Sequence, residues 1–376
     1  MPRILLVNSR YRPPHFRGGV ERYIDVLGKA LRRLGQDCEI VALEEPMPCN
    51  GGVPHRFLDV PAVPFLRPLL FGWMGRLLWA SADLIVLQYA PLGILMPKQK
   101  LVCTVHTTGY GEARALRRSS KASVRHGWHW LRRVVVLPME RYVYRRARAI
   151  VAISAQIAEE LVVAYGVRRE NLRVIGNGVD CTEFQPDTAV KGRSPFRLLY
   201  VGRLARRKNV DLLIEAVSKC TARVELRIVG AGPERPTLEA LTSDLNVGER
   251  ITFCGHRKGS ELLAEYQWAD LLVIPSSYEG VPLVSLEAKA AGLAIIAADF
   301  AGASHLVPAD SGWIVKDVTP ERLAIAIDES SRDFERLNRM SSCARKEALE
   351  TYSWNAVIGN LSSYYDSVLR QASFSR

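Results

Sequence analysis

The chain has 376 residues and a formal net charge of +12, with 48% hydrophobic and 24% charged residues. This length exceeds what one hydrophobic core usually serves, so it predicts two domains of roughly 150 to 190 residues each. The composition is that of an ordinary globular protein with enough apolar residues for a large core.

The cysteines and the apolar stretches exclude several classes of protein. The seven cysteines are scattered and never spaced C-x-x-C, which argues against a disulfide framework or a zinc site and fits a reducing compartment. Residues 1–17 resemble a short strand followed by a basic loop, so no signal peptide is expected. The most apolar region, residues 65–96, is interrupted by charged residues and prolines, so no membrane-spanning helix is expected.

Short apolar runs alternate with helical stretches along the whole chain. Such runs are typical of strands buried on both faces of a parallel sheet, with helices as crossovers. The expected strands are residues 3–8, 38–43, 83–88, 101–106, 149–154, 172–178, 197–203, 224–232, 251–256, 271–276 and 293–299. The pattern predicts two doubly wound α/β domains, 1–184 and 185–354, with a polar linker at 185–196 and a last helix, 355–376, that returns to the first domain.

In such sheets, ligands bind beyond the carboxyl ends of the strands, and two facing domains place the ligand in the cleft between them. In the first domain, Gly18 and Gly19 precede an amphipathic helix, where backbone N–H groups can approach an anion. A plain loop-to-helix turn explains them equally well. His106 ends the strand 101–106, a position that by itself fits a structural hydrogen bond better than a catalyst.

The basic residues are concentrated in the first half of the chain. Residues 1–180 hold 27 Lys and Arg against 14 Asp and Glu, whereas the remainder holds 24 against 25. Between Arg114 and Arg148, eleven Lys and Arg face a single acid, Glu140. This segment fits an anionic membrane surface, a solvated helix face or, least well, nucleic acid, for which no binding motif is present. The residues expected to contact membrane or acceptor are Arg117, Arg118, Lys121, Arg125, Trp128, Trp130, Arg132 and Arg133.

The second domain has two sites that follow strands. Arg203 and Lys208 come after one strand, as the cations that a diphosphate requires. Glu279 and Glu287 flank a turn and the start of a helix, where they could act as general acid and base or accept hydrogen bonds from a polyol. Pro282 suits the first turn of that helix, and the N–H groups of Val281, Leu283 and Val284 are then available to phosphate oxygens.

A set of motifs in chain order resembles one family. "EGVPLVSLE" is similar to the E-x7-E motif of retaining glycosyltransferases of family 4, which have the two-domain GT-B fold. "GGVERY", "TVHTT", "AISAQIAEEL", "VIGNGVDCTEF", "VGRLARRKNVDLLIEA", "RIVGAGPE", "ITFCGH" and "ADLLVIPSSYEG" resemble the other blocks of that family over residues 1–315. "YSWNAVIGNLSSYYDSVL" resembles its last helices.

The resemblance implies a role for each site. The first domain would bind the acceptor and the second the nucleotide sugar. Glu279 would hold hydroxyls of the transferred sugar and Glu287 the ribose, while Arg203 and Lys208 would neutralise the diphosphate. The resemblance also implies that Gly18 and Gly19 close over the donor. Gly255 and His256 would lie beside the base, and His106 would lie against the donor sugar.

The sequence also departs from the family pattern. Lys289 replaces a methionine, Leu293-Ala294 replace the usual x-Pro, and Asn209 replaces a glycine after Lys208. A glutamate expected near the sugar is replaced by Ser304 or His305. The resemblance therefore does not fix which sugar is transferred.

The resemblance implies a retaining glycosyltransferase. Because no D-x-D motif occurs and two cations with a helix end can stabilise the diphosphate, this enzyme is expected to be metal-independent. A UDP-sugar is the favoured donor, with GDP-mannose as an alternative. The acceptor is expected to be a lipid-linked or membrane-associated glycan of a bacterial envelope, on the inner face of the cell membrane. No cofactor and no nucleic-acid partner are expected. A sugar-nucleotide epimerase of the same fold, or a non-catalytic binding module, are the alternatives.

Overall fold

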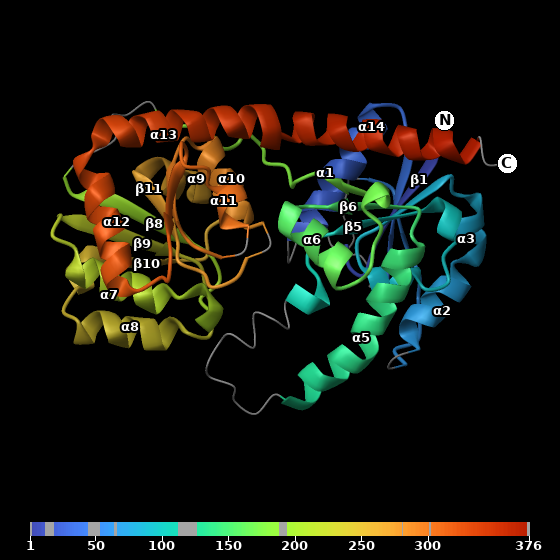
Figure 1. The fold of residues 1–376 in the computed structure, drawn as a ribbon, viewed down its shortest axis with the longest axis horizontal. Helices are drawn as coiled ribbons and strands as arrows, with labels where there is room; N and C mark the ends of the chain where they lie inside the picture. Colours follow the sequence, from blue (N-terminus) through green and yellow to red (C-terminus); the bar gives the residue numbers. More distant parts are fainter. Residues whose placement is uncertain are drawn as a thin grey trace. The chain divides into compact units, whose positions relative to one another are not determined.

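The computed structural model describes residues 2–11, 19–43, 53–63, 66–111, 126–187, 194–279, 281–300 and 302–373, with the backbone alone for 126–135 and 372–373. The chain divides into two compact units: unit 1 is Met1–Asn177 with Val357–Arg376, and unit 2 is Gly178–Ala356. Residues 178–184, which the sequence analysis assigned to the first domain, thus belong to unit 2 (Figure 1).

Unit 1 is built on a seven-stranded parallel sheet of order β3-β2-β1-β4-β5-β6-β7. Its strands are β1 (Arg3–Asn8), β2 (Asp37–Ala42), β3 (His55–Phe57), β4 (Leu84–Leu87), β5 (Leu101–Val105), β6 (Ala149–Ala152) and β7 (Leu172–Val174). The order reverses between β1 and β4, which makes the carboxyl ends of these strands the point where a ligand crevice is expected.

The helices of unit 1 are α1 (Gly19–Arg33), α2 (Arg67–Met74), α3 (Arg76–Ser81), α5 (His126–Arg146), α6 (Ala155–Val163) and α14 (Trp354–Ser373), with 3-10 turns η1 (Ala90–Gly93), η2 (Lys98–Lys100) and η3 (Arg169–Asn171). Of these helices, α1 and α6 pack on this sheet, whereas α2 and α5 contact η1. The returning helix α14 contributes to the core of unit 1, since Leu361 and Tyr365 are fully buried.

Unit 2 is built on a six-stranded parallel sheet of order β10-β9-β8-β11-β12-β13. Its strands are β8 (Phe196–Val201), β9 (Val224–Val229), β10 (Ile251–Gly255), β11 (Leu271–Ile274), β12 (Ala294–Ala298) and β13 (Gly312–Val315). Its helices are α7 (Val210–Lys219), α8 (Arg235–Asp244), α9 (Gly259–Trp268), α10 (Leu283–Ala290), α11 (Ala303–Leu306), α12 (Pro320–Arg332) and α13 (Phe334–Glu347), with 3-10 turns η4 (Arg206–Lys208) and η5 (Gly248–Arg250) and a π-helical turn η6 (Ala348–Tyr352).

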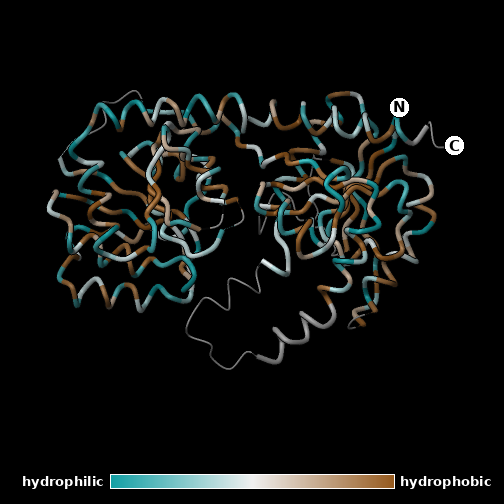
Figure 2. The backbone as a smooth tube through the Cα atoms, in the orientation of Figure 1, coloured by the Kyte–Doolittle hydropathy of each residue, from teal (hydrophilic) through white to brown (hydrophobic). Residues whose placement is uncertain are grey.

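The central strands of both sheets are buried along their length, and Figure 2 shows hydrophobic strand segments in the interior of each unit. This confirms the prediction of two doubly wound parallel sheets. The edge strands β3 and β13 were not predicted, because "HRF" and "GWIV" are too short to show a periodic pattern. None of the helices in the described ranges has the length and hydropathy needed to span a bilayer.

Two segments of the chain join the units, and both are anchored within unit 2. Gly178 packs on the Trp354 ring, and Val179 pairs with Ser353 in an isolated parallel bridge. The Arg345 guanidinium on α13 donates to the carbonyls of Cys181, Phe184 and Ala290. A single side chain therefore connects the first joining segment to the end of α10.

Candidate functional site

The strand order of unit 2 reverses between β8 and β11, and the two strands separate there. They pair only at Leu198–Leu271 and Leu199–Leu272, although each continues for two more residues. The separation opens the sheet at the carboxyl ends, where the loops after β8 and β11 begin. This is the place where doubly wound sheets bind ligands.

The structure brings together two of the predicted residues at this point. Lys208 Nζ, from the loop after β8, forms an ion pair and hydrogen bond with Glu279 Oε1, from the loop after β11. Their side chains are 14% and 8% exposed. Arg207 approaches Glu279 Oε2 at 3.9 Å and donates to the Tyr278 carbonyl at 3.3 Å. The sequence analysis did not single out Arg207, so its proximity to the carboxylate was missed.

Arg203 differs from Lys208 in its surroundings. It is exposed, and its guanidinium makes no hydrogen bond or ion pair with any residue that the structure describes. Its carbonyl accepts a hydrogen bond from the buried Tyr200 hydroxyl at 3.2 Å, which fixes the backbone beneath it. One cation of the pair is thus engaged by a carboxylate, and the other is open to solvent.

Asn209, a departure from the family pattern, has a structural explanation. Its φ of 50° lies in the left-handed region, which asparagine tolerates better than most residues. Its Nδ2 donates to the Pro275 carbonyl at 2.9 Å, and Ser277 N donates to the Arg207 carbonyl at 3.0 Å. The asparagine therefore keeps the backbone conformation that glycine allows and adds a hydrogen bond across the gap between β8 and β11.

Helix α10 begins at the same edge of the sheet. Pro282 is its N-cap, one position before the first turn in which the sequence analysis placed it. The N–H groups of Leu283 and Val284 have no preceding intrahelical carbonyl, as in the first turn of any helix. Glu287 lies in the second turn and is buried.

Glu287 is oriented by a tyrosine that the sequence analysis did not identify. The Tyr266 hydroxyl on α9 donates to Glu287 Oε2 at 2.8 Å and lies 3.4 Å from the Val284 carbonyl. Burial and the neighbouring carboxylate raise the pKa of Tyr266 well above its usual value, so the phenol stays protonated. This hydrogen bond from α9 holds the Glu287 carboxylate on α10 in one orientation.

Lys289, the second departure, is fully buried on α10. Its Nζ pairs with Glu347 Oε2 on α13 and lies 5.3 Å from the centroid of the Tyr352 ring. Burial lowers the pKa of Lys289, and the Glu347 carboxylate opposes this shift. The lysine thus replaces an apolar contact by an ion pair between α10 and the helix that leads to the second joining segment.

Three glycines shape the carboxyl ends of β8, β9 and β10. A Cβ on Gly230 would lie 1.8 Å from the Gly202 carbonyl oxygen, and Gly230 N donates to the Gly255 carbonyl at 2.7 Å. Gly230 also has a φ of 142°, which only glycine adopts readily. Of these, only Gly255 was predicted as a site residue, and the "GAG" after β9 was the signal that could have identified Gly230. His256 follows directly and is exposed.

In unit 1, His106 lies just beyond β5. Its Nε2 is 2.8 Å from Gln88 Oε1, at the end of β4, and its ring packs edge-on against Tyr23 of α1 at 4.9 Å. Burial lowers the pKa of His106 to about 4, so the imidazole is neutral near pH 7. Because an amide oxygen only accepts, the ring proton lies on Nε2 and Nδ1 is left as an acceptor.

Glu140, the single acid of the basic segment, is buried against the loop that follows His106. Its Oε2 accepts hydrogen bonds from Gly109 N at 3.2 Å and from the Tyr165 hydroxyl at 2.7 Å. The same hydroxyl accepts from Tyr110 N at 3.0 Å. Thr108 is bonded to Glu160 of α6. These contacts hold residues 108–110 in place, and a single acid within a basic segment was the signal that could have predicted them.

Several predicted residues cannot be placed. Gly18 lies outside the described residues, and Gly19 is the first residue of α1. Arg117, Arg118, Lys121 and Arg125 also lie outside them, while Trp128, Trp130, Arg132 and Arg133 are described only as backbone of α5. Among the described residues, no cluster of His, Cys, Asp and Glu could hold a metal ion.

The fold of this chain is GT-B, with two Rossmann-like α/β units. The structure is similar to that of sucrose-phosphate synthase from Thermosynechococcus elongatus, with a TM-score of 0.82 and 22% identity over 99% of this chain and 100% of that chain. It is also similar to HepE of Anabaena in complex with UDP and glucose, with a TM-score of 0.74 and 19% identity over 98% of this chain and 100% of that chain.

Family models match both halves of the sequence. The profile "Glycosyl transferases group 1" matches residues 182–347, and "Glycosyltransferase Family 4" matches residues 17–183. The chain is 28% identical over 97% of its length and 98% of the relative's to a GDP-mannose-dependent alpha-(1-6)-phosphatidylinositol monomannoside mannosyltransferase of Mycobacterium tuberculosis. Each half of the chain thus matches a glycosyltransferase model, which supports a group 1 glycosyltransferase, and the names of the relatives support sugar transfer in glycan biosynthesis. These matches favour the transferase over the epimerase and the non-catalytic module.

Proposed function

We propose that the protein is a retaining glycosyltransferase that moves a sugar from a nucleoside-diphosphate sugar to a hydroxyl group of a lipid-linked or membrane-associated glycan. The observation that carries this proposal is the arrangement at the gap between β8 and β11. There a buried Lys208–Glu279 pair lies in the same loop region as the exposed Arg203, next to the start of α10. Such a site combines cations for a diphosphate with a carboxylate for a polyol.

The proposed contacts follow from this arrangement. Arg203 and Lys208 bind the diphosphate, Glu279 accepts hydrogen bonds from the transferred sugar, and Glu287 accepts them from the ribose. The remaining donor contacts are proposed at the backbone of Gly18, Gly19, Gly255, His256, Val281, Leu283 and Val284. The tyrosine contact at Glu287 supports its role, because the hydrogen bond from the Tyr266 hydroxyl fixes the orientation of the carboxylate.

The proposed reaction breaks the bond between the anomeric carbon and the diphosphate oxygen. The acceptor oxygen forms its new bond on the same face of the sugar, and the leaving diphosphate takes the acceptor's proton. Negative charge grows on the diphosphate as the bond breaks, and Arg203 and Lys208 are positioned in advance to stabilise it. His106 is neutral near pH 7, and its Nδ1 accepts a hydrogen bond from a hydroxyl group of the donor sugar. Because the ring is uncharged, it does not compete with the two cations for the diphosphate.

The experiment tests sugar transfer from a nucleotide-sugar donor to a lipid acceptor. Purified protein is incubated with UDP-sugars and GDP-mannose, together with a lipid extract, and release of UDP or GDP is measured. NMR of the product then gives its anomeric configuration. Acceptor-dependent nucleotide release with retained configuration supports the proposal. Inverted configuration refutes the mechanism, and conversion of the donor without an acceptor favours the epimerase.

The cellular setting is part of the same proposal. The mycobacterial relative is named for a phosphatidylinositol acceptor, and another solved GT-B structure, WaaG, is named for lipopolysaccharide biosynthesis. These names support an envelope glycan as acceptor and the inner face of the cell membrane as the location. Fractionation of cells at low and at high salt tests the location, since a peripherally bound protein leaves the membrane fraction when salt is raised.

A further inference from the structure

Exposed apolar side chains are concentrated on one side of unit 1. Trp73 on α2 is 58% exposed and Leu77 on α3 is 78% exposed. Three further exposed side chains belong to the same region, and we call the five together the α2–α3 surface: Leu66, Trp73, Met74, Leu77 and Leu95. Figure 1 shows α2 and α3 at the outer edge of unit 1, following one another.

The turn after η1, which carries Leu95, lies against α2. A Cβ on Gly72 of α2 would lie 2.8 Å from Leu95 Cβ, so Leu95 packs directly against α2. The Arg146 guanidinium on α5 donates to the carbonyls of Ile94 and Met96, on either side of Leu95. The apolar surface therefore extends from α2 and α3 to the turn after η1, with α5 beside it.

The exposed residues are not misplaced core residues. The inner faces of the two helices are already packed, since Phe71 and Trp79 are buried with ring centroids 5.5 Å apart. Trp79 Nε1 donates to the Gly72 carbonyl at 2.9 Å. The outward side chains thus form a second apolar face that unit 1 does not use for folding, which is typical of an interaction surface.

The two stretches of chain that carry this face hold basic residues and no acidic ones. The sequence has no Asp or Glu in residues 60–82 or in residues 84–111. Arg76 lies with its guanidinium 4.7 Å from the centroid of the Trp73 ring, and Lys98 is exposed beyond η1. A second copy of this chain would bring the same basic face and be repelled, whereas anionic lipid headgroups would be attracted.

Aromatic, aliphatic and basic residues together match the interface of a bilayer. Tryptophan prefers the headgroup level, leucine and methionine enter the acyl boundary, and arginine stays near the phosphates. We propose that the α2–α3 surface inserts shallowly into an anionic membrane and anchors unit 1 there. The inference rests on the membrane association in the proposed function and assigns it to residues other than the basic segment named from the sequence.

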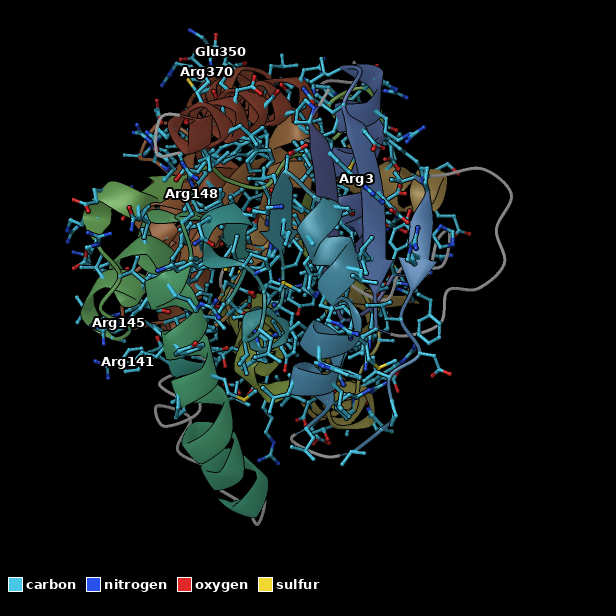
Figure 3. All side chains as sticks on the ribbon, turned by 90° about the vertical axis from the view of Figure 1, so that its right-hand side faces the viewer. Arg3, Arg141, Arg145, Arg148, Glu350 and Arg370 are labelled. Carbon is cyan, nitrogen blue, oxygen red and sulfur yellow. The ribbon has the colours of Figure 1, made fainter. Side chains whose placement is uncertain are left out.

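The basic side chains of α5 are separate from this apolar face. In Figure 3, which is turned by 90° from Figure 1, Arg141 and Arg145 project from α5 on the side away from α2. Both are exposed. They add long-range attraction to an anionic surface, while the α2–α3 surface supplies the apolar contact.

The experiment measures binding of the full chain to vesicles of phosphatidylcholine, with and without phosphatidylglycerol. Trp73→Ser and Leu77→Ser each remove one apolar side chain, and we expect each to weaken partitioning onto the anionic vesicles by about tenfold or more. Ile325→Ser, on α12 of unit 2 with 57% exposure, is the matched control and should bind like the wild type. Vesicles carrying brominated acyl chains should quench tryptophan fluorescence less in Trp73→Phe than in the wild type.

Each outcome decides the inference. Wild-type partitioning in both serine variants, or unchanged quenching in Trp73→Phe, overturns it. A concentration-dependent dimer that dissociates in Leu77→Ser would assign the surface to a second copy instead. Nucleotide release from the donor in detergent solution, without vesicles, should be the same in all variants. Vesicle binding without any transfer activity would refute the proposed function and leave this surface standing.

Discussion

Replacing Lys208 by methionine tests the central pair of the site. The substitution keeps the length and apolar stem of the side chain and removes its charge. Glu279, with 8% of its side chain exposed, would then retain only the Arg207 guanidinium at 3.9 Å. Removing one partner of a buried pair costs about 3–5 kcal/mol, and the remaining Arg207 contact reduces this to about 3 kcal/mol. For a unit of this size, Tm should fall by about 6–12 °C.

The matched control is Arg203→Met. Arg203 is exposed and contacts no described side chain through its guanidinium, so its loss should leave Tm within about 1 °C. Both variants should lower kcat/KM for the donor by about a hundredfold or more, because each removes a cation from the leaving diphosphate. The double variant Lys208→Met/Glu279→Gln should recover part of the lost stability, since no buried charge is left unpaired.

Thermal unfolding followed by circular dichroism, together with initial rates at varied donor concentration, measures these effects. Equal Tm values for Lys208→Met and Arg203→Met would show that the ion pair contributes nothing to unit 2. Near wild-type kcat/KM in both variants would refute the diphosphate assignment. Loss of stability with intact turnover would make Lys208 a structural residue only.

Three further predictions concern other buried groups and the absence of a metal. Glu140→Gln should destabilise unit 1 by about 1–2 kcal/mol in urea unfolding, because the charged acceptor of Gly109 N and the Tyr165 hydroxyl is lost; an unchanged midpoint would contradict this. The pKa of His106, near 4 when folded and near 6.5 when unfolded, means that the unfolded chain takes up the proton first as pH falls. The stability advantage of wild type over His106→Gln should therefore shrink by about 3 kcal/mol between pH 7 and pH 4, whereas parallel pH curves would disprove the burial of a neutral imidazole. EDTA should leave activity unchanged, and a loss restored by magnesium would identify a metal requirement.

The parallel strands could be predicted from the sequence, because a strand that is buried on both faces has a continuous run of apolar residues. Residues 3–8 and 271–274 are examples. Sequence analysis failed for β3 and β13, where three or four residues pair at a sheet edge and context decides. It also paired Glu279 with a sugar by resemblance, but contact with Lys208 depends on β8 and β11 being neighbours, which no local pattern encodes.

The contacts that support the site residues could not be predicted from the sequence for a similar reason. Tyr266 and Glu287 are on different helices, and the partner of Lys289 is Glu347, far along the chain. Tyr266, Glu287 and Lys289 are buried and therefore need partners, but the sequence alone does not say which. The sequence showed that Lys289 and Asn209 depart from the family pattern. The three-dimensional structure was needed to explain these residues by their contacts with Glu347 and the Pro275 carbonyl.

The return of the chain to unit 1 has a consequence for the order of folding during synthesis. Unit 2 is one continuous stretch, Gly178–Ala356, whereas unit 1 needs Val357–Arg376 to bury Leu361 and Tyr365. A ribosome completes the whole of unit 2 before it releases the last piece of unit 1, so the half translated first is the half that finishes folding last. A premature stop codon after Ala356 would therefore leave the sequence of unit 2 whole and leave unit 1 with an open core.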